Sequence, residues 1–355
     1  MTQRDLLANL NPGNEMQQTE DVSAFISFDN PFTIAAAALI GSILQHKSLD
    51  YKLNLYISNV GVRGGYIGRL NQMVRHRPDV NLIWLKPDEA RRRKLQQLYA
   101  NAETHYPPAA YSRLIIGDLL PNDVTKVIYL DVDMILRTDI ARLWAVPMNG
   151  MVALAAIDPL VAAKGSMALC GVPTKPSEKD HRYSDHLARL VASYGLSDLS
   201  FDGDDTYFQS GILVIDLDRY RALDCATRLI ETTDRMNNLS FPDQDALNIV
   251  LRKKIGTLDP RWNMVATLYD LKDGGASPYG PEVMDKLLRD PWVVHFTSRP
   301  KPWHLGCSHP FLHEWQKALE PSAWSGWRPN TLNQFLARLP RGWRILKKNL
   351  GRAFA

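Results

Sequence analysis

The sequence predicts an α/β fold in which helices flank a mostly parallel central sheet. Apolar, β-branched runs of strand length recur along the chain, a longer apolar run follows the first of them, and several runs end in a carboxylate. Continuous apolar runs are typical of parallel strands that are buried on both faces. In such sheets ligands bind at the carboxyl ends of the strands, where these acids lie.

Strand and helix patterns alternate along the chain. Residues 21–30 (DVSAFISFDN) predict a first strand that ends in polar residues, and residues 31–47 predict a helix whose alanines suit close packing on a sheet. A helical region is predicted at 111–120. The other predicted strands are 51–61, 80–86, 126–136, 151–158, 207–221 and 292–298.

Composition and cysteine content indicate a globular protein of a reducing compartment. The chain has 355 residues, of which 45% are hydrophobic and 23% are charged, values that are usual for globular proteins. Its three cysteines, Cys170, Cys225 and Cys307, form neither an even disulfide framework nor a closely spaced metal pair. We therefore expect thiols without a catalytic role and a cytoplasmic location.

Three segments are predicted. Residues 1–20 are polar and lack the apolar core of a signal peptide, so we expect a loose lead-in. Residues 21–320 form the main domain, with a possible insertion or lid at about 160–206, and residues 321–355 form a basic tail. The longest apolar stretch, FTIAAAALIGSIL, is shorter than the roughly 20 residues that cross a bilayer, which argues against a spanning helix.

Positive charge is concentrated in the tail. After Glu320 there is no acidic residue and there are seven Lys or Arg residues, so the net charge of +4 leaves −3 for the rest of the chain. The run RRRK at 91–94 is interpreted as a solvated helix face, and no nucleic-acid partner is expected.

The tail also has an amphipathic pattern. At 100° per residue its apolar side chains fall on one helical stripe, and Pro340 and Gly342 predict a break into two short pieces. A basic amphipathic segment with an interfacial Trp is typical of a helix that lies on an anionic membrane surface, although a helix packed on the body would show the same stripe. The stripe consists of Leu332, Phe335, Leu336, Leu339, Trp343, Leu346, Leu350 and Phe354.

Two carboxylates follow the strongest strand signal. Residues Val127 to Leu130 predict a buried strand, and Asp131 and Asp133 come directly after it. Because a buried unpaired carboxylate is costly, these acids belong where the strand ends and meets water, a metal or a cation. Residues i and i+2 of an extended chain point the same way. The pair therefore predicts a seat for Mn²⁺ or Mg²⁺ that shares its remaining positions with substrate phosphates, with a turn or a helix cap as the alternative.

Eight stretches, taken in order, resemble the retaining glycosyltransferases of family 8, a group that contains lipopolysaccharide galactosyl- and glucosyltransferases and glycogenin. They are ISFDN, YSRL, LPNDVTKVIYLDVDMILRTDIARLW, AAIDP, YFQSGILVIDLDRYR, FPDQDALNIVL, LDPRWN and VVHFTSRPKPWH, and they span about residues 21–315. The resemblance implies a nucleotide-diphospho-sugar transferase (GT-A-like) fold, a divalent cation that is usually Mn²⁺, and transfer of a hexose from a UDP-sugar with retention. It also implies a glycan or glycolipid acceptor. An acceptor built on lipid, such as a growing lipopolysaccharide core, would suit the location at the inner face of the membrane that the tail predicts.

The resemblance implies the following metal and donor contacts. Asp131, Asp133 and His295 match metal ligands, and Lys301 matches a lysine that meets the donor diphosphate. Without the resemblance, His295 would be interpreted as a core histidine and Lys301 as a solvated loop lysine. The other implied donor contacts are Asn30 (ribose), Arg113, Val132, Asp158 and Gln209.

Asp243 and Gln244 match the pair that faces the donor sugar, with the amide near the anomeric carbon. Gln244 is a poor nucleophile, which favours a front-face route in which the acceptor hydroxyl enters on the side that the diphosphate leaves. Asp243 stays open as a transient nucleophile. Ser240, Pro242 and Asp243 also fit an ordinary helix start whose acid complements the helix dipole.

Three positions depart from the family pattern. Phe28 stands where many members have an acid that touches uracil, Gln209 replaces the usual Asn, and Ser298 replaces a frequent Gly. The base and the hexose therefore stay open.

Two other classes of protein remain. One is a haloacid-dehalogenase-type phosphatase, in which Asp131 would be the nucleophile; the roughly 130 residues before that acid argue against it. The other is a non-catalytic sugar-nucleotide or glycan-binding module, which the complete set of implied catalytic residues argues against.

Overall fold

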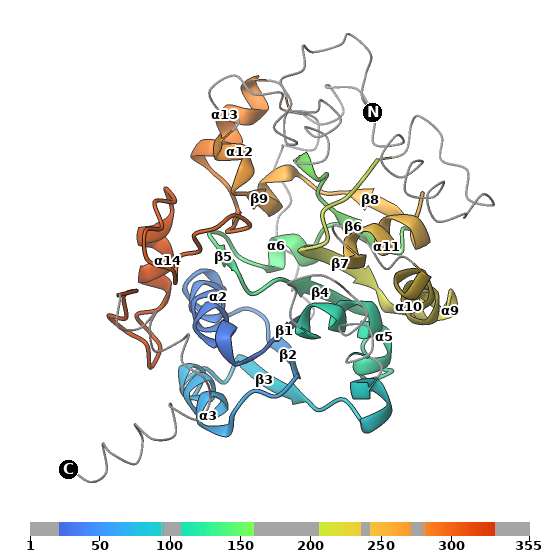
Figure 1. Cartoon of the computed structure of the whole chain (residues 1–355), viewed down its shortest axis with the longest axis horizontal. Helices are drawn as coiled ribbons and strands as arrows, with labels where there is room; N and C mark the ends of the chain where they lie inside the picture. Colours follow the sequence, from blue (N-terminus) through green and yellow to red (C-terminus); the bar gives the residue numbers. More distant parts are fainter. Residues whose placement is uncertain are drawn as a thin grey trace.

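A computed structural model describes residues 21–93, 95, 108–159, 206–235, 242–270, 279 and 281–330 of the chain. This part of the chain is an α/β structure built around two sheets (Figure 1). The predicted class, a mostly parallel central sheet with helices on its faces, is confirmed.

The main sheet has seven strands in the order β3-β2-β1-β4-β7-β6-β8. Neighbouring strands are parallel except that β7 runs antiparallel to both β4 and β6. Every residue of β1 is buried, as expected for the apolar run of a central parallel strand. The strands are β1 (Val22–Phe28), β2 (Leu53–Asn59), β3 (Val80–Leu85), β4 (Lys126–Leu130), β6 (Ala153–Ala155), β7 (Ile212–Asp216) and β8 (Ile255–Thr257).

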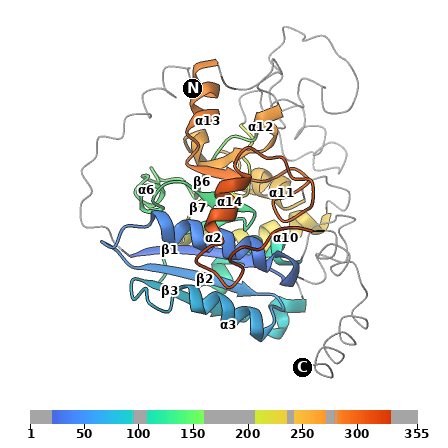
Figure 2. The ribbon, with the colours of Figure 1, turned by 90° about the vertical axis from the view of Figure 1, so that its left-hand side faces the viewer.

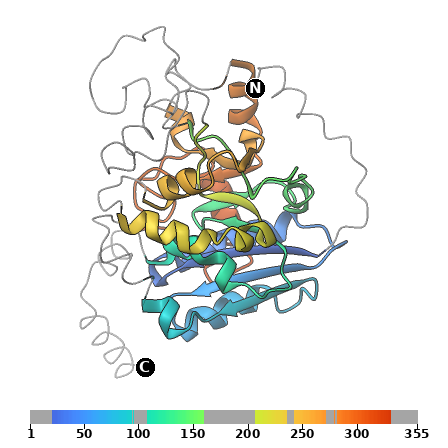
Figure 3. The ribbon, with the colours of Figure 1, turned by 90° about the vertical axis from the view of Figure 1, so that its right-hand side faces the viewer.

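Helices cover both faces of this sheet. Because successive side chains of a strand point to opposite faces, Ile26 of β1 packs in one core and Phe25 in the other. The first face, toward the viewer in Figure 2, carries α2 (Thr33–His46), α3 (Gly64–Met73) and α14 (Leu312–Ala318). The second face, toward the viewer in Figure 3, carries the 3-10 helix η2 (Pro108–Ile115), α5 (Ile116–Leu119), α9 (Leu217–Ala222), α10 (Cys225–Arg235) and α11 (Pro242–Val250).

The prediction of one strand at 126–136 is wrong, because the chain changes sheets there. β4 ends at Leu130, and β5 (Met134–Leu136) belongs to a second sheet of order β5-β10-β9. The linking residues are tied to both sheets: the Asp131 N–H donates to the Gly211 carbonyl beside β7 (2.8 Å), and the Phe296 N–H donates to the Asp133 carbonyl (2.9 Å). An apolar run resumes at Met134 directly after the link, so the sequence gives no sign that the chain has changed sheets.

The second sheet also contains the last predicted strand. β10 (Val293–His295) runs antiparallel to β5 and parallel to β9 (Met264–Val265), so residues 292–298 do not extend the main sheet. The remaining elements are η1 (Asn30–Phe32), α6 (Ala141–Trp144), η4 (Pro260–Asn263), α12 (Thr267–Asp270) and α13 (Pro281–Arg289).

Residues 312–330 pack on the face formed by α2 and α3. Gly41 of α2 permits this approach, because an added Cβ would lie 1.8 Å from the Ala318 carbonyl oxygen. Further along, Ser322 is buried and the Trp324 ring lies 6.2 Å from that of Tyr66 in α3. The start of the predicted basic tail, residues 321–330, therefore lies on the body of the protein.

Three predictions concern residues outside the described part: the lead-in at 1–20, nearly all of the insertion at 160–206, and the amphipathic segment from 331 onward. Among the helices that are described, none has both the length and the apolar character needed to cross a bilayer.

Candidate functional site

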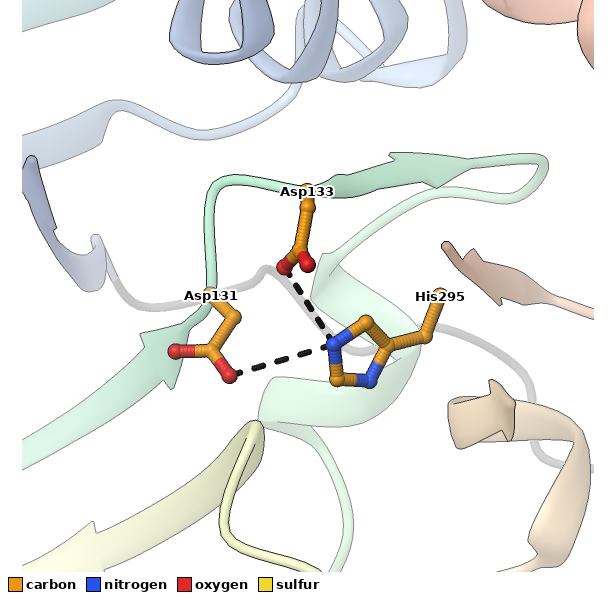
Figure 4. Close-up of side chains that lie close together, drawn as sticks. All are labelled: Asp131, Asp133 and His295. Atoms are coloured by element: carbon orange, nitrogen blue, oxygen red, sulfur yellow. Dashed lines mark ion pairs between the residues drawn. The ribbon is translucent and has the colours of Figure 1, made fainter. Parts of the chain in front are cut away.

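Asp131, Asp133 and His295 meet where the two sheets join (Figure 4). Asp131 follows β4, Asp133 precedes β5, and His295 ends β10. His295 Nε2 lies 3.8 Å from Asp131 Oδ2 and 3.2 Å from Asp133 Oδ1, and one ligand atom from each residue lies within 4.8 Å of the others. The structure thus brings together the three residues that the sequence suggested as metal ligands.

The donor set fits a divalent cation. Carboxylate oxygens with one imidazole suit Mn²⁺ or Mg²⁺. Asn263 donates its amide to Gln209 (2.5 Å) and turns its Oδ1 toward His295 Nδ1 (2.9 Å), so Nδ1 carries a proton and Nε2 is the nitrogen that a metal would use. Gly211 keeps the space open, because a Cβ there would lie 2.5 Å from the His295 ring and 2.9 Å from Asp131 Oδ2.

One side of the cluster is a buried network that begins at Asp131. Its Oδ1 accepts hydrogen bonds from Arg113 Nη2 (2.7 Å) and from the Tyr129 hydroxyl (2.7 Å). Burial raises the pKa of Asp131, and the Arg113 charge opposes that rise. Burial alone would lower the pKa of Arg113, but the charge of Asp131 and its other neighbours raises it instead, so Arg113 stays a cation.

Arg113 links Asp131 to the predicted catalytic pair. Its Nε lies 3.1 Å from Asp243 Oδ2, and its Nη1 donates to the Ser210 carbonyl (3.0 Å) and hydroxyl (2.8 Å). The Ser210 N–H donates to Gln244 Oε1 (3.0 Å), and Gln244 Nε2 donates to Asp158 Oδ2 (2.7 Å). We call this connected set the Asp131 side of the site. Its members are Asp131, Tyr129, Arg113, Asp243, Ser210, Gln244 and Asp158.

The other side begins at Asp133. Lys301 Nζ donates to Asp133 Oδ2 (2.7 Å) and to the carbonyl oxygens of Phe296 and Thr297. Burial works to raise the pKa of Asp133, but the charge of Lys301 and the neighbouring His295 outweigh it and hold the pKa well below its ordinary value. We call Asp133, His295 and Lys301, with the supporting Asn263 and Gln209, the Asp133 side.

Three residues of the site were missed by sequence reasoning. Each lies in a stretch that carries the family resemblance, and two of the three contact a residue that is more than 30 positions away in the sequence. A polar residue in an apolar stretch gives no sign of its partner until the fold supplies one. The missed residues are Tyr129, which donates to Asp131, Ser210, which donates to Gln244, and Asn263, which contacts His295.

Two predicted donor contacts lie differently from the rest. Asn30 follows β1 at the same sheet edge, and its side chain accepts from the Arg63 N–H (2.9 Å) and donates to the Gly61 carbonyl (2.9 Å). The Val132 side chain is buried in the same core as the apolar residues of α2, so its backbone is the part left to meet a donor. Both assignments stay predictions.

The described cysteines lie outside the site. Cys225 is buried in α10, where burial raises the pKa of its thiol to about 11, and Cys307 lies in the loop that follows Lys301. A thiol with so high a pKa is a weak nucleophile at neutral pH. Cys170 falls outside the described residues.

Residues 23–307 match the sequence model described as glycosyl transferase family 8. The chain therefore belongs to glycosyl transferase family 8. Its relatives include proteins that match at low identity. General stress protein A of Bacillus subtilis is 22% identical over 325 residues, which are 90% of this chain and 100% of that protein. The lipopolysaccharide 1,2-glucosyltransferase of Escherichia coli K12 is 26% identical over 61% of this chain and 55% of its own length.

A third relative is the lipopolysaccharide 1,3-galactosyltransferase of Salmonella typhimurium, which is 27% identical over 61% of this chain and 56% of its own length. The match therefore spans little more than half the length of these two lipopolysaccharide enzymes. Among solved structures, the apo bifunctional glycosyltransferase WbbM has a TM-score of 0.65 at 20% identity, covering 88% of this chain and 51% of that one. The galactosyltransferase LgtC, in complex with donor and acceptor sugar analogues, has a TM-score of 0.64 at 17% identity, covering 91% and 99%. These likenesses confirm the nucleotide-diphospho-sugar transferase fold.

Proposed function

We propose that the protein is a metal-dependent, retaining hexosyltransferase that moves a hexose from a UDP-sugar to a glycan or glycolipid acceptor. The observation that supports this most strongly is the Asp131, Asp133 and His295 cluster, with Lys301 on one side and the Gln244 network on the other. A seat of oxygen and imidazole ligands beside a lysine suits a sugar diphosphate, whose oxygens attract both a divalent ion and an ammonium group.

The cluster and Lys301 would act on the leaving diphosphate. Asp131, Asp133 and His295 would hold Mn²⁺ or Mg²⁺, and the bound ion would supply Lewis-acid stabilisation of the charge on the leaving group. Lys301 would add a positive charge at the same place. Its ammonium is already oriented there by Asp133 and two backbone carbonyls, so little reorganisation is needed when a diphosphate binds.

The contacts of Asp243 and Gln244 support a front-face route. The Asp243 carboxylate lies 3.1 Å from the buried Arg113 guanidinium, which stabilises its charge and weakens it as a nucleophile. The Gln244 amide is held in one orientation by Ser210 and Asp158. Gln244 then serves as a polar wall beside the anomeric carbon, while the acceptor hydroxyl enters on the side of the leaving diphosphate, whose oxygen takes the proton.

The choice of donor would depend on Asn30, Val132, Arg113, Asp158 and Gln209. Gln209 Oε1 already accepts from the Gly211 N–H (2.6 Å) and from Asn263 (2.5 Å), which leaves its Nε2 as the donor toward a sugar hydroxyl. The names of the lipopolysaccharide glucosyl- and galactosyltransferase relatives support a hexose and an acceptor of that class.

The acceptor class also suggests where the protein works. A lipid-linked glycan would be met at the inner face of the membrane, and the acid-free tail from residue 331 onward would attach the enzyme there by its basic residues and apolar stripe. The test is to end the chain after Asn330 and compare its co-sedimentation with anionic vesicles to that of the full chain at low and high salt. Equal sedimentation of the two would refute the attachment.

The reaction is tested with a panel of sugar nucleotides and Mn²⁺. We expect a UDP-hexose and Mn²⁺ to raise the melting temperature together more than the sum of their separate effects, since the diphosphate completes the ion's ligands. We also expect hexose release or transfer that a chelator stops and Mn²⁺ restores. Transfer at an undiminished rate in the chelator would show the metal assignment to be wrong.

The same panel separates the rival classes. Cooperative binding without any turnover would indicate a sugar-nucleotide-binding module. Hydrolysis of a simple aryl phosphate, with no preference for a sugar nucleotide, would indicate a phosphatase that uses Asp131. The phosphatase is disfavoured by the Asp131 contacts, because a carboxylate held by Arg113 and Tyr129 is poorly placed to attack phosphorus.

A further inference from the structure

The segment that leads into β7, residues 208–211, contributes to both sides of the site. Its Ser210 contacts Gln244 on the Asp131 side, and its Gln209 contacts Asn263 on the Asp133 side. The segment lies before the first residue of β7 and contains an isolated bridge. Because two predicted donor-sugar residues depend on this short piece of chain, whatever holds its backbone also affects how the site meets a sugar.

Two side-chain amides of α11 hold the backbone of this segment. Asn248 accepts from the Phe208 N–H through Oδ1 (2.8 Å) and donates to the Phe208 carbonyl through Nδ2 (2.9 Å). Gln244, one helical turn earlier, accepts from the Ser210 N–H through Oε1 (3.0 Å). Residues four apart lie on the same face of a helix, so both amides meet the segment together. Asn248 supplies the partners that buried backbone groups otherwise find in a neighbouring strand.

The contacts of Asn248 fix the orientation of its amide. Nδ2 also donates to the Gln244 carbonyl (2.9 Å), so both of its protons are used and the side chain is buried. The reversed amide would point its oxygen at two carbonyl oxygens, which excludes that orientation. A further contact, from the Tyr207 hydroxyl to Asp245 of α11 (2.5 Å), joins two side chains and does not hold the backbone.

We propose that Asn248 is a positioning residue of the transfer reaction. It fixes the register between α11 and residues 208–211, and it thereby holds Gln244 and Gln209 at the separation that one hexose requires. The inference rests on the proposed function, in which these two residues face the donor sugar. Asn248 has no free N–H for a substrate, so it acts through them.

The register is tested with Asn248→Ala in the full chain. The matched control is Leu247→Ala, because Leu247 is the preceding residue of α11 and is buried in the core of the second face, so its truncation removes packing but no side-chain hydrogen bond. Three quantities are measured: kcat and KM with a UDP-hexose and Mn²⁺, the Kd of UDP with Mn²⁺, and amide hydrogen exchange by NMR. UDP has no hexose, so its Kd reports the metal and diphosphate contacts alone.

We expect Asn248→Ala to lower kcat by about a hundredfold, the loss that a displacement of about 1 Å at a reacting centre causes. The Kd of UDP with Mn²⁺ should stay within about threefold of the parent value, because the Gly211 carbonyl remains tied to the Asp131 N–H (2.8 Å) and only the Phe208 end is freed. Leu247→Ala should lower the melting temperature but leave kcat within about threefold at a temperature where it is folded. The proposal is overturned if both variants lower kcat equally, or if Asn248→Ala weakens UDP binding as much as it lowers kcat.

Hydrogen exchange tests the register without any turnover. In the parent, the Phe208 amide should exchange as slowly as the amides of β7, and in Asn248→Ala it should exchange at least about tenfold faster while β7 is unchanged. Fast exchange of the Phe208 amide in the parent would overturn the proposal even if the variant failed to fold. A parent that protects this amide but turns over no sugar nucleotide would instead refute the proposed function and, with it, the purpose of the register.

Discussion

The two aspartates of the candidate metal site lie in opposite environments although they are two residues apart. Asp131 lies at the main sheet, where its partners Arg113 and Tyr129 are themselves buried and where burial raises the pKa of Asp131. Asp133 lies at the second sheet, where the charge of Lys301 outweighs the effect of burial and lowers the pKa of Asp133. One carboxylate is held by the core of the protein, and the other by a lysine on a loop.

This difference suggests that the Asp131 side supports the fold, whereas the Asp133 side can exchange its contacts when a ligand binds. Asp131 is tied into the protein core, because its partner Arg113 also pairs with Asp243 and donates to Ser210. In the proposed reaction, Lys301 would turn to the diphosphate of a donor when a metal ion takes its place on Asp133. We therefore expect changes on the Asp131 side to reduce the stability of the fold, and changes on the Asp133 side to reduce binding and turnover.

The largest expected effect is that of Asp133→Asn. The substitution keeps the shape and one acceptor oxygen but removes a charged metal ligand, so turnover with a UDP-hexose and Mn²⁺ should fall by about a thousandfold or more. The melting temperature without ligands should change little, since Lys301 keeps two carbonyl partners. Substantial residual turnover, or a protein that unfolds, would contradict the assignment of Asp133 to the exchanging side.

Arg113→Leu is expected to act on stability instead. It leaves Asp131 and Asp243 inside the protein without their cation, and removal of one partner of a buried pair costs about 3–5 kcal/mol. Urea unfolding followed by circular dichroism measures this loss. The matched control is Arg91→Leu, whose exposed pair with Asp88 should contribute no more than about 1 kcal/mol. Equal stability of the two variants would mean that the Asp131 side is not a support.

The sequence predicts these two sides unequally. The strand before Asp131 could be recognised because four apolar residues precede a carboxylate, and the helix from Pro242 could be recognised because a Pro and acids begin it. The change of sheet between Asp131 and Asp133 could not be recognised, since Met134 to Leu136 continue the same apolar pattern. The pattern of apolar residues indicates which residues are buried, but it does not indicate to which sheet a strand belongs.

The contacts within the site depend still more on the fold. Arg113 was implied as a donor-sugar contact, and the structure shows a buried arginine whose guanidinium meets two acids. Asn263 lies in a stretch that carries the resemblance, but its role could not be recognised, because its partner His295 is brought to it by the pairing of β9 with β10. The types and order of residues identify the family. The role of each polar residue can be assigned only when its neighbours in the folded protein are known.

Asn263→Ala tests the Asp133 side, and we expect an effect of intermediate size. Without Asn263 the His295 ring loses the acceptor that orients it, and loss of such a support weakens metal binding by about 10- to 100-fold. Mn²⁺ affinity is measured by electron paramagnetic resonance, and the protonated nitrogen of His295 by ¹⁵N NMR of the metal-free protein.

The conservative variant Asn263→Asp separates positioning from packing. It keeps an acceptor for His295 Nδ1 and loses the donor to Gln209, so it should restore most of the Mn²⁺ affinity while the KM for the donor stays raised. If both variants bind Mn²⁺ like the parent and His295 keeps the same protonated nitrogen, Asn263 only fills space.

The smallest expected effect is a pH dependence on the Asp133 side. His309 packs against Phe296, which follows the metal ligand in β10, with 4.6 Å between the ring centroids. Its Nδ1 accepts from the Phe311 N–H (3.2 Å), and its Nε2 has no partner among the described residues. Burial lowers the pKa of His309 from 6.5 to about 4. The imidazole that packs on Phe296 is therefore neutral in the folded protein at neutral pH.

The sign of the effect follows from proton binding. As the pH falls below 6.5, His309 binds a proton in the unfolded chain, but in the folded protein it does so only near pH 4. The free energy of unfolding therefore decreases as the pH falls through this window, and the contribution of His309 to stability is complete above it. The slope is at most about 1.4 kcal/mol per pH unit, and smaller in practice because the ring keeps some solvent contact. His309→Asn should flatten the dependence of the urea midpoint on pH in this window, whereas His313→Asn, at an exposed position of α14, should leave it as in the parent. Parallel curves for the parent and His309→Asn would show that His309 is not the source of the pH dependence in this window.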